Sequence, residues 1–219
     1  MNRITLFRTI PRIVMGPGAL NQLADEVRAL KAKKVLIVTD QGLIKAGLVK
    51  QAQAVLEKAD IKYAVFGDVE ADPRYEIVAD CVEIIRRENA DLIIGFGGGS
   101  PIDIAKVSAV MAINEGPISE YFGIDLIPNA GLSTLIIPTT AGTGSEVTSN
   151  AVISKSGKEG FKKSLRHDNY IPDIALVDHL LMCQCPPQLT AACGMDTFSQ
   201  LVEGYLSTKS STVTDAIAL

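Results

Sequence analysis

Near-continuous apolar runs of four or five residues recur along the first two thirds of the chain. The segments between these runs carry apolar residues at helical spacing instead. This alternation is typical of a sheet whose strands are joined by helices. The runs predict four strands, at residues 35–38, 63–66, 92–96 and 135–138.

The intervening segments predict the helices. Residues 20–30 place their apolar side chains on one stripe, and residues 48–56 repeat the pattern after the first strand. A third helix has an apolar face between residues 77 and 85, with Asp72 as its expected N-cap and Pro73 as its first residue. Because the strands are apolar throughout, we predict an α/β fold with a parallel, Rossmann-like sheet that is covered on both faces.

The pattern changes after Pro187. From Thr190 onward no segment resembles a strand, and apolar residues between 195 and 205 recur at helical spacing. Residues 214–219 begin a further helix without a C-cap or a glycine or proline stop. We therefore predict an α/β domain over residues 1–187 and, over residues 188–219, the first helices of an incomplete all-α domain with little to pack against.

Composition narrows the class of protein. With 219 residues, 47% apolar and 21% charged, the chain resembles a soluble globular protein. Its net charge is −4 and its basic residues are scattered, which argues against a nucleic-acid partner. The apolar runs are far shorter than the ~20 residues of a membrane helix, and the N-terminus lacks the apolar stretch of a secretion signal. We expect a cytoplasmic protein with no membrane or nucleic-acid partner.

Four cysteines do not make a disulfide framework in a chain of this length. Cys183, Cys185 and Cys193 lie close together in sequence, but their spacing is unusual for zinc and no fourth ligand is evident. We interpret them as free thiols.

The first chemical motif follows the third predicted strand, where glycines lead directly into a helix. Consecutive glycines let a backbone approach a pyrophosphate closely, and the amides and positive dipole end of a helix N-terminus bind the anion. Ser100 also suits an N-cap, Pro101 the first helical position and Asp103 the third, an approximate capping box. A bare tight turn is the alternative, but the order of strand, glycines and helix favours a phosphate site at Gly97, Gly98, Gly99 and Ser100.

Two polar segments follow other strands. Asp40 comes after the first strand, where a carboxylate accepts from a ribose hydroxyl and repels a 2′-phosphate; a simple turn residue explains it equally well. Residues 139–146 contain three threonines and two glycines after the strand at 135–138. Such a loop suits the ligand crevice of an open α/β sheet, the alternative being a flexible connection.

Three motifs together resemble the iron-containing (group III) alcohol dehydrogenase family, which includes lactaldehyde and 1,2-propanediol reductases. They are residues 97–106 (GGGSPIDIAK), residues 138–148 (PTTAGTGSEVT), and residues 194–196 (GMD) followed by Glu203. The resemblance spans essentially the whole chain. It implies an N-terminal nucleotide-binding domain, a C-terminal helical domain, and a metal in the cleft between them.

The resemblance also implies ligands and partners. The cofactor is expected to be NAD, the substrate a small alcohol or aldehyde, and the assembly a homo-oligomer such as a dimer. Lys162, ten residues before Pro172, matches a family lysine that reaches the nicotinamide ribose. The cofactor-binding residues implied are Asp40, Asp72, Gly97, Gly98, Gly99, Ser100, Asp103, Thr139, Thr140, Thr143 and Lys162.

The family's metal site takes one Asp and three His to hold Fe(II) or Zn(II). Asp196 matches the first ligand, although an N-cap of the following helix explains it as well. Gln200 stands where the first His is expected, one helical turn later, and an amide is a poorer ligand than an imidazole. His167 and His179 match no family ligand.

These features predict the cofactor-binding portion of an NAD(H)-dependent, metal-dependent alcohol dehydrogenase, without alcohol turnover in the 219-residue form. One alternative is a non-catalytic nucleotide-binding or scaffold paralogue, which Gln200 favours. Another is an enzyme of the related glycerol dehydrogenase and dehydroquinate synthase branch.

Overall fold

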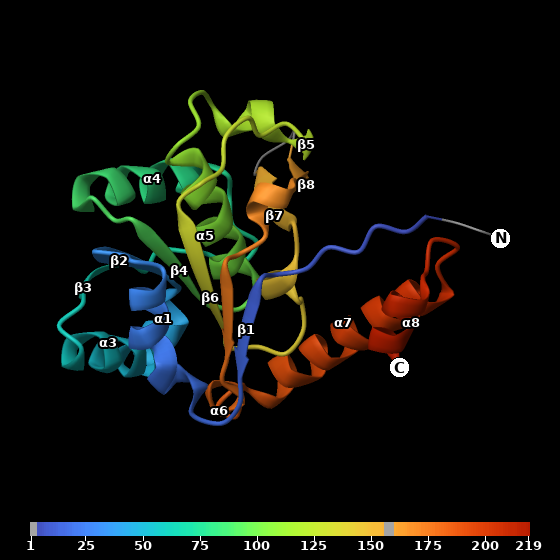
Figure 1. Cartoon of the computed structure of the whole chain (residues 1–219), viewed down its shortest axis with the longest axis horizontal. Coiled ribbons are helices and arrows are strands. Elements are labelled where there is room, and N and C mark those ends of the chain that lie inside the picture. The colour runs from blue at the N-terminus through green and yellow to red at the C-terminus, as the bar shows by residue number, and fades with distance from the viewer. Residues whose placement is uncertain (1–3, 156–159) are drawn as a thin grey trace.

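A parallel six-stranded sheet forms the centre of the molecule in the computed structural model, which describes residues 4–155 and 160–219 (Figure 1). The strand order is β1-β9-β6-β4-β2-β3, and every pairing is parallel. The predicted α/β class and its four strands are therefore confirmed. The strands are β1 (Arg12–Met15), β2 (Lys34–Val38), β3 (Lys62–Phe66), β4 (Leu92–Gly97), β6 (Ser133–Pro138) and β9 (Ile174–Val177).

Helices cover both faces of this sheet, as the alternation of side chains along β2 illustrates. Leu36 and Val38 pack on one face with helices α4 (Glu76–Glu88) and α5 (Gly99–Met111). Val35 and Ile37 point to the other face, where 3-10 helix η1 (Ala19–Gln22) and helices α1 (Leu23–Ala29) and α3 (Leu48–Lys58) pack. Because successive side chains of a strand alternate, a strand covered on both faces must be apolar throughout.

Helix α5 is the most enclosed helix in the described part of the chain. All residues from Pro101 to Met111 are buried, and the helix approaches β4 so closely that a Cβ at Gly95 would lie 3.2 Å from the Cα of Ile102. The N-terminus of α5 is thereby fixed beside the carboxyl end of β4.

A smaller three-stranded sheet, in the order β5-β8-β7, packs beside α5. Its strands β7 (Asn150–Lys155) and β8 (Phe161–Arg166) pair antiparallel, whereas β5 (Gly123–Ile124) joins β8 in parallel. These three strands, and β1 and β9, were not predicted. The remaining short elements are α2 (Gln41–Lys45), η2 (Ile118–Tyr121), η3 (Ser145–Val147), η4 (Asp168–Tyr170) and α6 (His179–Met182).

The predicted start of the third helix was wrong. Helix α4 begins at Glu76 rather than Pro73, and Asp72 lies before it with a left-handed φ of 50°. The backbone of the intervening segment pairs with β7: Ser154 N–H donates to Pro73 O at 2.9 Å, and Tyr75 N–H donates to Ser154 O at 2.8 Å. Pairing with the sheet leaves this segment unable to form the first helical turn.

Two helices end the chain, as the periodicity predicted. Helix α7 (Pro187–Leu206) leads away from the sheet, and α8 (Thr212–Ala218) packs against α7 (Figure 1). Neither helix buries a residue, and Phe198 is 60% exposed. No helix in the described part of the chain is long and apolar enough to cross a membrane. The division into domains at residue 187 stays a prediction, although α7 begins at that residue.

Candidate functional site

The candidate site lies where the order of the strands in the sheet reverses. The chain runs outward from β2 to β3, and then crosses back over β2 to form β4 on its other side. The loops after β2 and β4 therefore lead to helices on opposite faces, which opens a crevice at the carboxyl ends of these strands. β6 ends beside β4, with Gly97 paired to Pro138. This register brings the glycine segment and the threonine loop together.

The glycine segment begins helix α5 earlier than predicted. The helix starts at Gly99, its N-cap is Gly98, and neither Ser100 nor Asp103 caps it, so the expected capping box is wrong. Asp103 instead accepts from Ser145 Oγ and from Val152 N–H, the latter at 2.8 Å. A proline in the third helical position has no N–H to donate, so the free donors of the first turn are the amides of Gly99 and Ser100.

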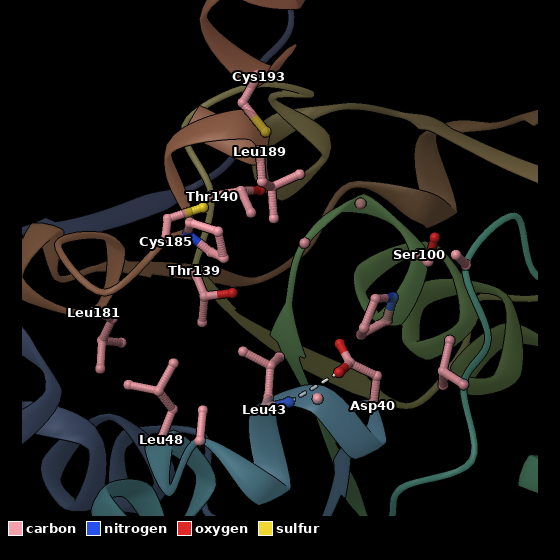
Figure 2. A pocket seen from close by; sticks show the side chains of 18 of the residues that line it. Asp40, Leu43, Leu48, Ser100, Thr139, Thr140, Leu181, Cys185, Leu189 and Cys193 are labelled. Carbon is pink, nitrogen blue, oxygen red and sulfur yellow. Dashed lines mark hydrogen bonds between the residues drawn. The ribbon is translucent and has the colours of Figure 1, made fainter. Parts of the chain in front are cut away.

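A cavity of about 700 Å³ opens in front of this helix N-terminus. That volume is in the range of small-molecule sites. Apolar side chains from α2, α3, α6 and α7 form much of its wall (Figure 2). The predicted cofactor residues that line it are Asp40, Gly98, Gly99, Ser100, Thr139, Thr140 and Thr143.

Asp40 has a local structural role and also lines the cavity. Its carboxylate accepts from Leu43 N–H at 2.9 Å and so caps helix α2, and its side chain also lines the cavity (Figure 2). The carboxylate thus stands at the end of β2, where a ribose lies in this kind of sheet.

The three glycines have different reasons to lack a side chain. Gly97 has φ 153°, and a Cβ there would lie 2.7 Å from Pro101 Cγ, so the fold itself requires glycine. A Cβ on Gly99 would approach Thr143 Cγ2 to 2.9 Å. Gly98 has an ordinary extended backbone, and its nearest neighbour would be Thr140 Oγ1 at 3.4 Å. The fold would accept alanine at Gly98, so the open backbone there suits a ligand.

A second, more polar cavity of about 530 Å³ adjoins the first, because Gly99, Ser100 and Thr143 line both. Four predicted residues that do not line the first cavity line this one: Asp72, Asp103, Lys162 and Asp196. Gly97 lines neither cavity. Its only ion pair among the described residues joins Lys162 Nζ to Asp72 Oδ1 at 2.5 Å, and both side chains are largely exposed. Burial raises the pKa of Asp103, although Lys106 nearby opposes the shift.

The described residues do not by themselves form a metal site. Asp196 and Gln200 both line the second cavity from the interior of α7, so the N-cap interpretation of Asp196 is wrong. Gln200 Nε2 donates a long hydrogen bond of 3.5 Å to Gly142 O. No group of three or more His, Cys, Asp or Glu side chains suited to a metal occurs in the described chain. One carboxylate and an amide are too few ligands for Fe(II) or Zn(II).

The wall opposite the glycines was not predicted. Leu181, Leu189, Cys185 and Cys193 line the first cavity (Figure 2). Cys185 and Cys193 are free thiols, as expected. Nothing in the sequence indicated that they line the cavity, because the cavity wall is formed by the tertiary packing of α6 and α7.

Comparison with known proteins identifies the family. Residues 11–179 match the model of the family described as iron-containing alcohol dehydrogenase. This chain belongs to that family. The resemblance inferred from the glycine and threonine motifs is therefore confirmed.

Among relatives in the iron-containing alcohol dehydrogenase family, the sulfoacetaldehyde reductase of Bilophila wadsworthia is 38% identical over 96% of this chain. The NAD-dependent methanol dehydrogenase of Bacillus methanolicus is 36% identical over 99% of it. The match covers 54% and 56% of those two proteins, so the chain spans about half the length of these relatives.

Solved structures of the family agree with the fold. A 1,3-propanediol oxidoreductase superposes with a TM-score of 0.94 and 36% identity, covering 99% of this chain and 56% of that one. A sulfoacetaldehyde reductase from Bifidobacterium kashiwanohense, solved in complex with NAD⁺, gives a TM-score of 0.92 at 31% identity and covers 99% and 57%.

Proposed function

We propose that this chain is the cofactor-binding portion of an NAD(H)-dependent dehydrogenase that interconverts a small alcohol and its aldehyde. The observation that carries the proposal is the pair of adjoining cavities at the carboxyl ends of β2, β4 and β6, with the open backbone of Gly98 between strand and helix. Membership of the family and the NAD⁺ complex of a relative support it.

In this proposal an extended dinucleotide occupies both cavities, with one end in each. In the first, Asp40 accepts from the adenine ribose, and the amides of Gly99 and Ser100 donate to the pyrophosphate. In the second, Lys162 and Thr143 face the nicotinamide end. When bound, NAD supplies the carbon that accepts a hydride from the alcohol. The residues of this chain bind and orient that cofactor, and the apolar wall excludes water from it.

Replacement of Gly98 by alanine tests this proposal. Because the backbone of Gly98 suits alanine, we expect Gly98→Ala to unfold at the wild-type temperature while its Kd for NAD, measured by calorimetric titration, rises tenfold or more. Gly204→Ala is the matched control, since Gly204 lies in α7 with nothing within 4 Å of an added Cβ. Wild-type chain that binds neither NAD nor NADP at millimolar concentration, or Gly98→Ala that binds NAD as well as wild type, would contradict the proposal.

A non-catalytic nucleotide-binding protein is the second candidate, favoured by the amide of Gln200 and its bond to Gly142 O. The dehydrogenase requires Asp196 to join further ligands, which the described residues do not supply, in a metal site. In a protein of the relatives' full length, Asp196→Asn should then weaken binding of Fe(II) or Zn(II). The non-catalytic protein requires the variant and wild type to bind these metals alike, and titration of each metal decides between them.

We further propose that the 219-residue form does not turn over alcohol and that it self-associates, as a dimer or larger, in the cytoplasm. Robust turnover of short alcohols in the presence of NAD and either metal would contradict the first statement. Sedimentation tests the second.

A further inference from the structure

Helix α5 contains a buried cation that the proposed function does not use. Lys106 is 1% exposed. Its ammonium group donates to three backbone carbonyls: Ser145 O at 2.9 Å, Thr148 O at 2.8 Å and Asn150 O at 2.6 Å. An ammonium has three protons and no acceptor, so the three carbonyls match its donors one for one.

No carboxylate in the described chain lies within ion-pair distance of this ammonium. Asp103 is the nearest charged residue on the same helix, one turn earlier. Its carboxylate accepts hydrogen bonds from Ser145 Oγ and Val152 N–H. Lys106 and Asp103 therefore hold the same stretch of backbone, residues 145–152, at several points. This arrangement fixes a loop to a helix and does not simply neutralise a charge.

The stretch held by Lys106 continues the threonine loop. Thr143 lines both cavities, and Ser145, Thr148 and Asn150 line the second. Between β6 and β7 this loop has four backbone bonds outside the strands: the turns from Val147 N–H to Gly144 O and from Thr148 N–H to Ser145 O, and bonds from Thr139 N–H to Gly97 O and from His167 N–H to Ser149 O. Its shape also depends on the two side chains of α5.

We propose that Lys106 is a positioning residue: by donating to three carbonyls it holds residues 143–150 in the shape that receives the nucleotide. The effect on nucleotide binding rests on the proposed function, whereas the effect on the loop does not. A buried cation is costly without hydrogen bonds, so an apolar side chain would serve a purely structural α5 better.

The protonation of Lys106 is consistent with this role. Burial lowers its pKa to about 8, and the carboxylates of Asp103 on the same helix and Glu146 on η3 oppose the shift. The three carbonyls also favour the protonated form. The side chain is therefore an ammonium at neutral pH.

Lys106→Met tests the proposal, because it keeps an unbranched apolar chain as far as Cε and removes the ammonium group with its three donors. We expect hydrogen exchange of the amides in residues 143–150 to accelerate tenfold or more without nucleotide, while β2 and β4 stay protected. We also expect the Kd for NAD to rise tenfold or more. Lys106→Ala with n-propylammonium, which replaces the missing atoms, should restore both; tetramethylammonium, which has no N–H, should not.

Lys106→Met that folds, keeps wild-type protection over residues 143–150 and binds NAD as wild type does would overturn the proposal. If wild type does not bind NAD, the proposed function fails, and the exchange measurement still tests Lys106. If Lys106→Met does not fold, Lys106→Ala is measured with and without n-propylammonium; protection over residues 143–150 that the amine does not raise would overturn the proposal, and protection that this amine raises but tetramethylammonium does not would support it.

Discussion

At the scale of single residues, the site combines side chains that each have a structural partner as well as a proposed ligand. Asp40 caps α2 and faces the cavity, Lys162 pairs with Asp72, and Asp103 anchors residues near β7. A variant that removes the whole side chain therefore confounds two effects. The informative substitutions keep one role and remove the other.

Asp40→Asn separates the two roles of Asp40. Asparagine caps a helix as well as aspartate does, so α2 should remain and the thermal midpoint should not change. Loss of the negative charge removes repulsion of a 2′-phosphate, and we expect the affinity for NADP relative to NAD to rise on the order of tenfold, equivalent to about 1.4 kcal/mol. Titration of both nucleotides measures the ratio. Asp40→Ala, which also loses the cap, is the comparison; an unchanged ratio in Asp40→Asn would exclude the charge as the discriminator.

The structure agrees best with residue-level expectations where a motif carries its own geometry. The glycine segment and the threonine loop were predicted to lie at a ligand crevice because each follows a strand, and both line the cavities. That they bind a ligand stays a prediction. The predicted capping role of Asp103 was wrong because its carboxylate accepts instead from Ser145 and Val152, which are 42 and 49 residues away in sequence. Local rules cannot anticipate a partner supplied by another element.

At the scale of elements, the same contrast holds. β2, β4 and β6, inside the sheet, were predicted because they are apolar on both faces, and the edge strand β3 was predicted from its apolar run. β1, the other edge strand, was missed because it is largely exposed, with Met15 71% exposed. β9 was missed although it is apolar and mostly buried. β7 and β8 were missed because polar residues interrupt them, and their stability comes from pairing with each other and packing beside α5.

Helix α7 contacts the loop that follows β6, where its Thr197 Oγ1 donates to Gly142 O at 3.2 Å. A Cβ at Gly142 would lie 3.0 Å from Cys193 Cβ and 3.2 Å from Cys193 Cα, so the backbones are in close contact. Because a helix backbone cannot yield as a side chain does, the angle of α7 depends on this glycine.

We expect Gly142→Ala to displace α7 and to destabilise its attachment by about 1–3 kcal/mol, the usual cost of overpacking. The rate at which a maleimide modifies Cys193, followed by peptide mass spectrometry, should increase. Gly194→Ala is the control, since an added Cβ there meets nothing within 4 Å. Equal rates in wild type and Gly142→Ala would show that the contact does not hold the helix.

At the scale of the whole molecule, the buried ionisable groups predict how stability depends on pH. The pKa of Lys106 in the folded chain, about 8, is below its usual value of 10.5. The unfolded chain therefore binds more protons between these values, and the free energy of unfolding rises with pH across this window, by at most about 3 kcal/mol from this group. Below pH 8 the contribution is absent, because both states are protonated.

Cys81 has the opposite effect on the free energy of unfolding. Burial raises the pKa of its thiol to about 12, so above pH 9 the thiol ionises in the unfolded chain but not in the folded one, and the free energy of unfolding falls. The difference between wild type and Lys106→Met isolates the lysine. We expect urea unfolding to show that wild type gains stability relative to Lys106→Met as the pH rises from 8 to 10. A difference that does not vary with pH would mean that Lys106 does not titrate in this window.

The burial of α5 along its length has a consequence for how this protein resists proteolysis. Helix α5 begins at the glycine segment and packs along one core, so a ligand held by its first turn is linked to the packing of that core. A ligand that binds only the native chain adds RT ln(1 + [L]/Kd) to its stability, about 2.7 kcal/mol at a hundredfold excess over Kd. With the proposed nucleotide site, excess nucleotide should therefore slow proteolysis of the chain.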